Sequence, residues 1–237
     1  MNKLLDIAPK IIQDWNGFKA KNIYDLDDPE DLASQIGGFY KKYGLDITPG
    51  LYRSVVRLPR FSYFRAPVTN TIPNRELNIL QVALLIILPD FYGTLTEKLR
   101  SMDKDEYTSS KARKLDYITC SGVFEKRGNH WLVNHSGYIC LDIDHIEDPE
   151  ELKGRLANDE KLMPELIFIS PGGKGIKCIV SIDIKAATHD KYFSALSSYL
   201  DLNYGVEIDS ACKDVSRACF LCHDPDCFIN SKHLQLC

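Results

Sequence analysis

The chain contains 237 residues and 44% of them are hydrophobic, which is enough to build a substantial core and excludes an intrinsically disordered protein. Its formal net charge of −4 argues against a protein that holds nucleic acid by bulk positive charge, although it leaves local basic patches open. No stretch approaches the roughly 18 uncharged apolar residues of a membrane span, and the N-terminus lacks the apolar block of a signal peptide, so we expect a cytoplasmic protein.

The first half of the chain predicts a helical appendage followed by the start of a larger domain. Residues 1–58 contain two stretches at helical spacing and show no chemistry of their own, so we place the main domain at residues 59–237. The elements expected at the start of this domain are a strand at Arg60 to Phe64, a buried helix or long strand at Leu77 to Leu88, a helix at Thr94 to Met102, and short strands at Tyr117 to Phe124 and Trp131 to Val133.

The second half of the chain alternates strands and helices in an informative order. Read along the chain it predicts β-α-β-β-α-β, the split βαβ pattern of ferredoxin-like and RNA-recognition-type sheets, and hence an α+β fold. The expected elements are a strand at Gly137 to Asp144, a helix from Asp148, strands at Leu166 to Ser170 and Ile176 to Ile182, a helix from Thr188 to Gly205, and a last part that begins at Val206 to Asp209 and continues through Ala218 to Cys222.

That strand order has geometric consequences for three acidic and basic residues. In such a sheet the last strand lies antiparallel beside the first, so we expect Asp209 to lie near Asp144. The same simple order places Lys177 toward the far end of the sheet from Asp144, too far for a triphosphate to bridge comfortably. The strands before Gly137 would then have to supply the missing geometry.

The strand at Gly137 to Asp144 ends in the sequence LDID. Asp142 and Asp144 are two residues apart on a strand and therefore point the same way, roughly 6 to 7 Å apart at the backbone, so both can reach one ion or a close pair of ions. Their hard oxygen ligands favour Mg²⁺ or Mn²⁺. The alternative is that the two residues are exposed acids at a strand end that lead into a helix cap.

Two further stretches carry groups suited to phosphate. SPGGKGIK, from Ser170 to Lys177, is a glycine-rich turn between apolar strands, in which backbone N–H groups and two lysines can approach phosphate oxygens. It is not a Walker loop, because it leads into a strand, and the alternative is a plain hairpin turn. Arg217, before the last apolar stretch, could bind phosphate bidentately or pair structurally with Asp214.

The eight cysteines raise a separate question about metal binding. Three of them lie in apolar runs and are expected to be reduced core residues. The C-terminal cysteines, with two histidines nearby, are an alternative zinc site, although their spacing lacks the two close pairs of a typical structural site. The residues of this alternative are Cys212, Cys219, Cys222, Cys227, His223 and His233.

Taken together, LDID, SPGGKGIK and EID (Glu207 to Asp209) resemble the three motifs of the archaeo-eukaryotic primase superfamily. Within it the chain resembles the primase-polymerase-like N-terminal domains of plasmid and phage replication proteins related to virulence-associated protein E. The resemblance covers about residues 60 to 230. It implies a primase-polymerase-like catalytic domain with an RRM-like sheet.

By this resemblance, Asp142, Asp144 and Asp209 would hold two metal ions that activate a primer 3′-hydroxyl and stabilise the leaving pyrophosphate. The triphosphate would be bound by Ser170, Gly173, Lys174, Lys177 and Arg217. Lys114 and Arg127 are weaker candidates for template or phosphate contact. Lys177 stands where many members of the superfamily carry histidine, so charge is retained but imidazole proton transfer is lost.

The resemblance implies a metal-dependent DNA primase or primase-polymerase, a nucleotidyltransferase that copies a single-stranded DNA template from NTPs or dNTPs. Such a protein would serve the replication of a mobile element, and a helicase module is an expected partner. One alternative is a nucleic-acid-binding module that keeps the primase shape without polymerising, which Lys177 and the acidic net charge favour. A metal-dependent nuclease is the other, because clustered aspartates and lysines also serve phosphodiester hydrolysis.

Overall fold

The computed structural model describes residues 58–233. The helical appendage predicted for residues 1–58 therefore lies outside the described residues, apart from Leu58. The helices are α4 (Ile79–Ile87), α5 (Pro89–Arg100), α6 (Lys104–Lys114), α7 (Pro149–Ala157) and α8 (His189–Tyr204). The strands are β1 (Arg60–Phe64), β2 (Arg75–Asn78), β3 (Tyr117–Thr119), β4 (Gly122–Phe124), β5 (Leu132–His135), β6 (Tyr138–Asp144), β7 (Leu166–Ile169), β8 (Gly175–Ser181), β9 (Cys219–Phe220) and β10 (Phe228–Ile229).

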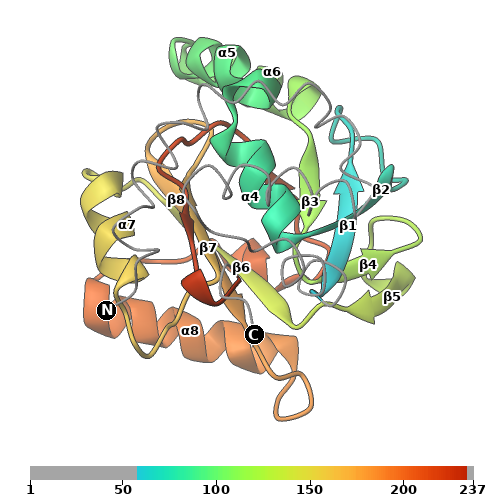
Figure 1. The fold of residues 1–237 in the computed structure, drawn as a ribbon, viewed down its shortest axis with the longest axis vertical. Coiled ribbons are helices and arrows are strands. Elements are labelled where there is room, and N and C mark those ends of the chain that lie inside the picture. The colour runs from blue at the N-terminus through green and yellow to red at the C-terminus, as the bar shows by residue number, and fades with distance from the viewer. Residues whose placement is uncertain (1–57, 234–237) are drawn as a thin grey trace, which may run out of the picture.

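The strands form two four-stranded sheets and a small hairpin, and together with the helices they give an α+β fold (Figure 1). The first sheet has the order β2-β1-β3-β9, the second has the order β10-β7-β8-β6, and β4 pairs with β5. Every strand pair in them is antiparallel. The predicted α+β class is therefore confirmed.

The second sheet contains the predicted split βαβ unit. Helix α7 connects β6 to β7, and β8 lies between these two strands and antiparallel to both. The predicted position of the last strand is wrong, however. β10 pairs with β7 at the opposite edge, residues 206–209 form no strand, and β9 joins the first sheet beside β3.

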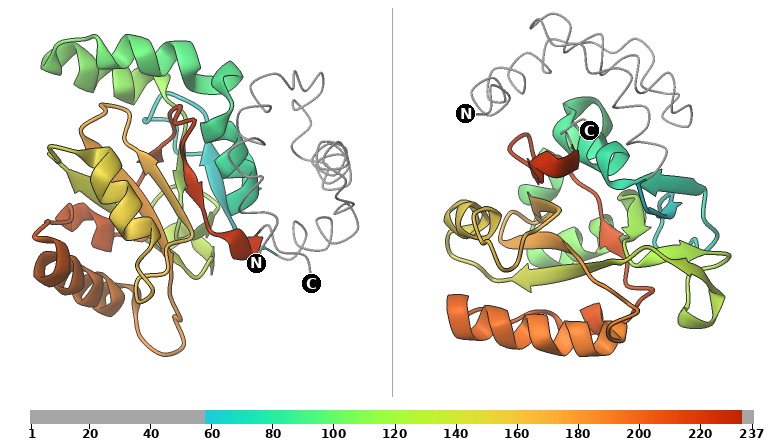
Figure 2. Two further views of the ribbon diagram at one scale, coloured as in Figure 1. Left: turned by 60° about the vertical axis from the view of Figure 1, so that its left-hand side comes forward. Right: turned by 60° about the horizontal axis from the view of Figure 1, so that its bottom comes forward.

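The second sheet buries both of its faces because its strands alternate between two apolar sets. Ile139, Leu141 and Ile143 of β6 pack with α7 and α8, while Tyr138 and Cys140 belong to the core shared with α4 and the first sheet. Figure 2 shows α7 and α8 on one side of this sheet and α4 on the other. The side chains of β6 that alternate with the α7–α8 set therefore face the first sheet.

Helix α4 packs between the two sheets, and its sequence was compatible with either a helix or a strand. The stretch from Leu77 was predicted as a buried helix or a long strand, and it begins as the end of β2 before turning into α4. The change is fixed by a capping box, in which Asn78 accepts from the Gln81 N–H and the Gln81 side chain accepts from the Asn78 N–H. Because α4 is apolar on nearly all sides, it is stable only when enclosed.

Helix α6 was not predicted. Its eleven residues, KDEYTSSKARK, bury only Ser110, so the apolar periodicity that marks the other helices is missing. Asp103 caps its N-terminus by accepting from the Asp105 and Glu106 N–H groups, and basic residues in the last turn complement the helix dipole. Local capping and charge therefore specify this helix.

Among the described residues, no single helix is long and apolar enough to cross a membrane. α4 and α5 meet the length and composition requirement only as a pair, and they are bent by 60° at the break between them.

Replacing Leu141 by alanine tests the core behind β6. Leu141 is fully buried, so Leu141→Ala should lower the free energy of unfolding by about 3 to 5 kcal/mol. Leu202→Ala is the matched control, because Leu202 is 82% exposed on α8 and its removal should change stability by less than about 0.5 kcal/mol. Urea unfolding measures both, and equal effects of the two substitutions would contradict the packing described for β6.

Candidate active site

Asp142 lies near the end of β6 and is only 5% exposed. Its neighbour across the sheet is Lys177 of β8, which is 7% exposed, and the Lys177 Nζ forms an ion pair with Asp142 Oδ2. The prediction that Lys177 lies far from the aspartates is therefore wrong. β8 runs antiparallel beside β6, so the beginning of β8 lies next to the end of β6.

The environment of this pair favours a charged lysine. Burial by itself would lower the pKa of Lys177, but the adjacent Asp142 carboxylate more than offsets it and raises the pKa above its ordinary value. Lys177 therefore stays protonated across the physiological pH range. A buried ammonium of this kind needs its carboxylate partner, because an isolated charge at this depth would be strongly destabilising.

Asp209 reaches the same place from a different segment. Its backbone N–H donates to the Asp142 carbonyl oxygen at 2.9 Å, along the free edge of β6. Its carboxylate Oδ1 accepts from the Ala211 N–H at 3.0 Å, while Oδ2 pairs with the Arg217 guanidinium. Asp209 thus lies near the predicted position, held by an extended segment and not by a strand of the sheet.

Arg217 connects Asp142 and Asp209. The same Arg217 nitrogen that pairs with Asp209 lies 3.8 Å from Asp142 Oδ2. Burial lowers the pKa of the guanidinium, and Asp209 together with Asp142 raises it, with a net increase. The side-chain partner of Arg217 is therefore Asp209. Asp214, the structural partner considered from the sequence, contacts Arg217 through the backbone, where the Arg217 N–H donates to the Asp214 carbonyl oxygen at 3.0 Å.

Two polar atoms of this group lack a partner. Asp142 Oδ1 and Arg217 Nε are both buried and form no hydrogen bond. A buried carboxylate oxygen without a donor is destabilising, so Asp142 Oδ1 is well suited to a cation. The carboxylates of Asp142, Asp144 and Asp209 are the hard donors that Mg²⁺ or Mn²⁺ prefers, and the residues present fit such an ion.

The three carboxylates are not drawn tightly together. Within residues 58–233, the only set of three or more acidic, histidine or cysteine ligand atoms within 4.8 Å of one another consists of cysteines. Asp144 is exposed at the end of β6, while Asp142 and Asp209 already have cationic partners. Binding of an ion by all three carboxylates would therefore require Arg217 to leave Asp209.

The glycine-rich turn lies directly beside Asp144. Gly173 adopts φ of 73°, and its N–H donates to the Ser170 carbonyl oxygen at 2.9 Å. A Cβ on Gly175 would lie 2.6 Å from the Ile143 carbonyl oxygen and 3.0 Å from Asp144 Oδ1, so glycine is required where β8 approaches β6. Lys174 is exposed at the tip, and Ser170 is buried at the base.

Helices α5 and α6 contribute three residues that were not predicted for the site. A Cβ on Gly172 would lie 2.9 Å from the Tyr107 hydroxyl, and one on Gly173 would lie 3.3 Å from Arg100 Nε. Lys111 Nζ lies 5.3 Å from the centre of the Tyr107 ring. The turn is therefore enclosed on its outer side by basic and aromatic groups.

Burial and the nearby charges of Lys177 and the aspartates affect the pKa values of Lys111 and Tyr107. Burial lowers the pKa of Lys111, and the neighbouring Lys177 lowers it further. Burial raises the pKa of the Tyr107 hydroxyl to about 12. Lys111 stands in a basic cluster of the sequence, but its role was not apparent because the helix that positions it was not predicted.

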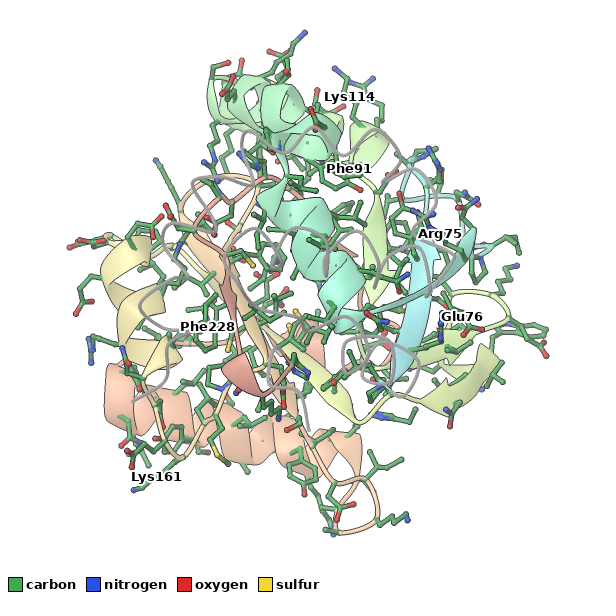
Figure 3. All side chains as sticks on the ribbon, viewed as in Figure 1. Arg75, Glu76, Phe91, Lys114, Lys161 and Phe228 are labelled. Carbon is green, nitrogen blue, oxygen red and sulfur yellow. The ribbon has the colours of Figure 1, made fainter. Side chains whose placement is uncertain are left out.

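The two weaker candidates lie elsewhere. Lys114 is exposed at the C-terminal end of α6, at the top of the view in Figure 3. The Arg127 guanidinium carbon lies 5.1 Å from the centre of the Tyr117 ring, and the Arg127 backbone N–H donates to the Thr71 carbonyl oxygen. Within residues 58–233, neither side chain forms a hydrogen bond or ion pair with the aspartates or with the glycine-rich turn.

The C-terminal cysteines and histidines do not converge, so the alternative zinc site at that run is not supported. Cys212 packs in the core on the α7–α8 side of the second sheet, whereas Cys219 lies in the other core with Cys120 and Cys140. Burial raises the pKa of Cys212 and Cys222 to about 12. Cys222 and the two histidines each bond to a different group. Cys222 Sγ donates to the Ile169 carbonyl, and His223 Nδ1 is 3.0 Å from the Ile86 carbonyl. His233 Nε2 is 2.6 Å from Glu165 Oε2.

A sequence model of the family described as "BT4734-like, N-terminal domain" matches residues 110–228, half of the chain, and the chain belongs to this family. The matched segment contains Asp142, Asp144, the glycine-rich turn, Asp209 and Arg217. No curated protein and no solved structure matches the chain.

Removal of the Lys177 charge should expose the energetic cost of an unpaired Asp142. We expect Lys177→Met to lower the free energy of unfolding by about 3 kcal/mol, with Arg217 at 3.8 Å preventing a larger loss. Lys185→Met, at an exposed position, is the control and should have little effect.

The double variant Asp142→Asn/Lys177→Met completes the test, with urea unfolding measured in the presence of a chelator. It should be more stable than the sum of the single effects predicts, by at least about 1 kcal/mol. Strict additivity of the two substitutions would contradict a buried ion pair.

Proposed function

We propose that this member of the BT4734-like N-terminal domain family is a metal-dependent nucleotidyltransferase of the primase-polymerase type. Its substrates would be nucleoside triphosphates and a single-stranded DNA template. The observation that carries the proposal is that Asp142 Oδ1 is buried and has no partner. A second acid, Asp209, bonds to the backbone of Asp142, and a third, Asp144, lies two residues further along β6.

Asp142, Asp144 and Asp209 would hold Mg²⁺ or Mn²⁺, which when bound supplies activation of a hydroxyl nucleophile and neutralisation of phosphate charge. The protein's own contribution is positional. β6 fixes Asp142 and Asp144, and the Asp209 N–H contact to the Asp142 carbonyl holds the third acid against the same strand. Acids from two segments 67 residues apart in the sequence are thereby brought to one edge of the sheet.

The basic groups around the acids suit a triphosphate. Lys177 and Arg217 lie against the carboxylates, and Lys174 and Arg100 lie at the glycine-rich turn. An arriving triphosphate offers these groups new anionic partners, so Arg217 can exchange Asp209 for phosphate oxygens and leave Asp209 free for the metal. Arg217 Nε, which is buried without a partner, is a donor that a phosphate would satisfy.

A surface for template phosphates is offered by α5 and α6. The last turns of the two helices carry five basic residues, of which Arg100 lies at the glycine-rich turn, although the net charge of the chain is negative. Single-stranded DNA is held mainly through its phosphates and by stacking on aromatic side chains. The basic residues are Lys98, Arg100, Lys111, Arg113 and Lys114.

One observation favours the second candidate, a nucleic-acid-binding module without catalysis. Lys177 and Arg217 already neutralise Asp142 and Asp209, so the group is balanced without an added cation. A protein that keeps this arrangement permanently would bind single-stranded DNA through α5 and α6 and would incorporate no nucleotide.

Primer extension on a single-stranded DNA template with Mn²⁺ and either NTPs or dNTPs tests the proposal. Incorporation should occur with the unaltered chain and fall at least about 100-fold in Asp142→Asn and in Asp144→Asn, because each substitution removes a metal-binding charge. Glu147→Gln is the matched control, since Glu147 is an exposed acid three residues beyond Asp144, and it should retain full activity.

Three other outcomes would contradict the proposal. Activity that survives Asp142→Asn and Asp144→Asn would remove the metal assignment. Binding of the template without incorporation by the unaltered chain would identify the binding module. Degradation of labelled single strands without added triphosphate would identify a nuclease, because hydrolysis needs only water as the second substrate.

A further inference from the structure

A cluster of three cysteines lies in the core between the two sheets. The sulfur atoms of Cys120, Cys140 and Cys219 all lie within 4.8 Å of one another. They come from three separate segments: Cys120 follows β3, Cys140 is in the middle of β6, and Cys219 is in β9. The sequence gives no indication of this site, because its members are separated by 20 and 79 residues and form no close pair.

We propose that Cys120, Cys140 and Cys219 form a thiolate site for a soft divalent metal ion of the zinc type, which ties the two sheets together behind the carboxylates. In a tetrahedral site with zinc–sulfur bonds of roughly 2.3 Å, the sulfur atoms lie about 3.8 Å apart, so the three cysteines would fill three of the four positions and leave the fourth to a small ligand such as water. The cluster therefore needs to contract by about one ångström or less to hold such an ion. The soft sulfur donors would select an ion different from the one suited to Asp142.

The cluster is enclosed, and a buried cation lies near it. The three residues are 2%, 8% and 2% exposed, which excludes competing water from most of the site. Three thiolates and a divalent ion leave one net negative charge, and the Lys177 ammonium is close enough to act electrostatically on Cys140 and Cys219.

The position of the cluster gives the ion a structural role. Ile118 of β3 pairs with Cys219 of β9 in the first sheet, whereas Cys140 belongs to the second sheet. Cys140 also precedes Asp142 by two residues and lies on the same face of β6. A bound ion would therefore fix β6 relative to the first sheet close to the point where Asp142 must be held.

The test begins with the unaltered chain, purified under reducing conditions without added metal. We expect elemental analysis to find about one zinc ion for each chain and EDTA to remove it only after unfolding, because the site is enclosed. Refolding with Co²⁺ should then give the thiolate-to-cobalt charge-transfer absorption of a sulfur-ligated ion. A chain that retains no zinc and shows no such absorption would overturn the proposal.

Variants identify the ligands. Cys140→Ser and Cys219→Ser should weaken metal retention about 100-fold or more, whereas Cys178→Ser, at a fully buried thiol of β8 outside the cluster, should leave it unchanged. Asp142→Asn should also retain the ion, so failure of this proposal is distinguishable from failure of the proposed nucleotidyltransferase. Cobalt–thiolate absorption that persists in Cys219→Ser would place the metal elsewhere.

Discussion

The ion pair between Asp142 and Lys177 is the constraint on which the rest of the site depends. Both side chains are largely excluded from water on the face of the second sheet that meets the first sheet. Burial of two charges is favourable only when each has a close partner, which fixes β6 and β8 in register at this point. Because Lys177 uses one oxygen of Asp142, the other is left buried and free.

This balance of charge shapes the function that we propose. Three carboxylates face Lys177, Arg217 and Lys111, so the group is close to neutral before any ligand arrives. A divalent cation alone would add positive charge, and a triphosphate alone would add negative charge beside the acids. The two neutralise each other when they bind together, and the exchange of Arg217 from Asp209 to phosphate gives the protein a physical means of coupling them.

Much of the second sheet could be predicted from the sequence because its strands follow a strict alternation. Ile139, Leu141 and Ile143 face one core while Asp142 faces the other, as the period of two requires. The position of Asp209 was also predicted, but for the wrong reason. The last strand pairs at the opposite edge, and only two residues, Phe228 and Ile229, form it, which is too short for a pattern to be visible.

The parts that could not be predicted depend on polar contacts between distant segments. Helix α6 lacks apolar periodicity, so its contribution of Tyr107 and Lys111 to the site could not be anticipated. The choice of Asp209 over Asp214 as the partner of Arg217 depends on how residues 206–217 fold against β6. The convergence of Cys120, Cys140 and Cys219 likewise requires both sheets to be in place.

The central claim is that Asp142 binds a divalent cation together with a triphosphate, and anomalous diffraction tests it most directly. Crystals grown with Mn²⁺ and a nonhydrolysable nucleoside triphosphate should show a manganese peak bonded to Asp142 Oδ1, roughly 2.2 Å away. The guanidinium of Arg217 should have moved from Asp209 to the phosphates. A structure in which the triphosphate is bound, Arg217 still pairs with Asp209 and no manganese lies at Asp142 would contradict the account.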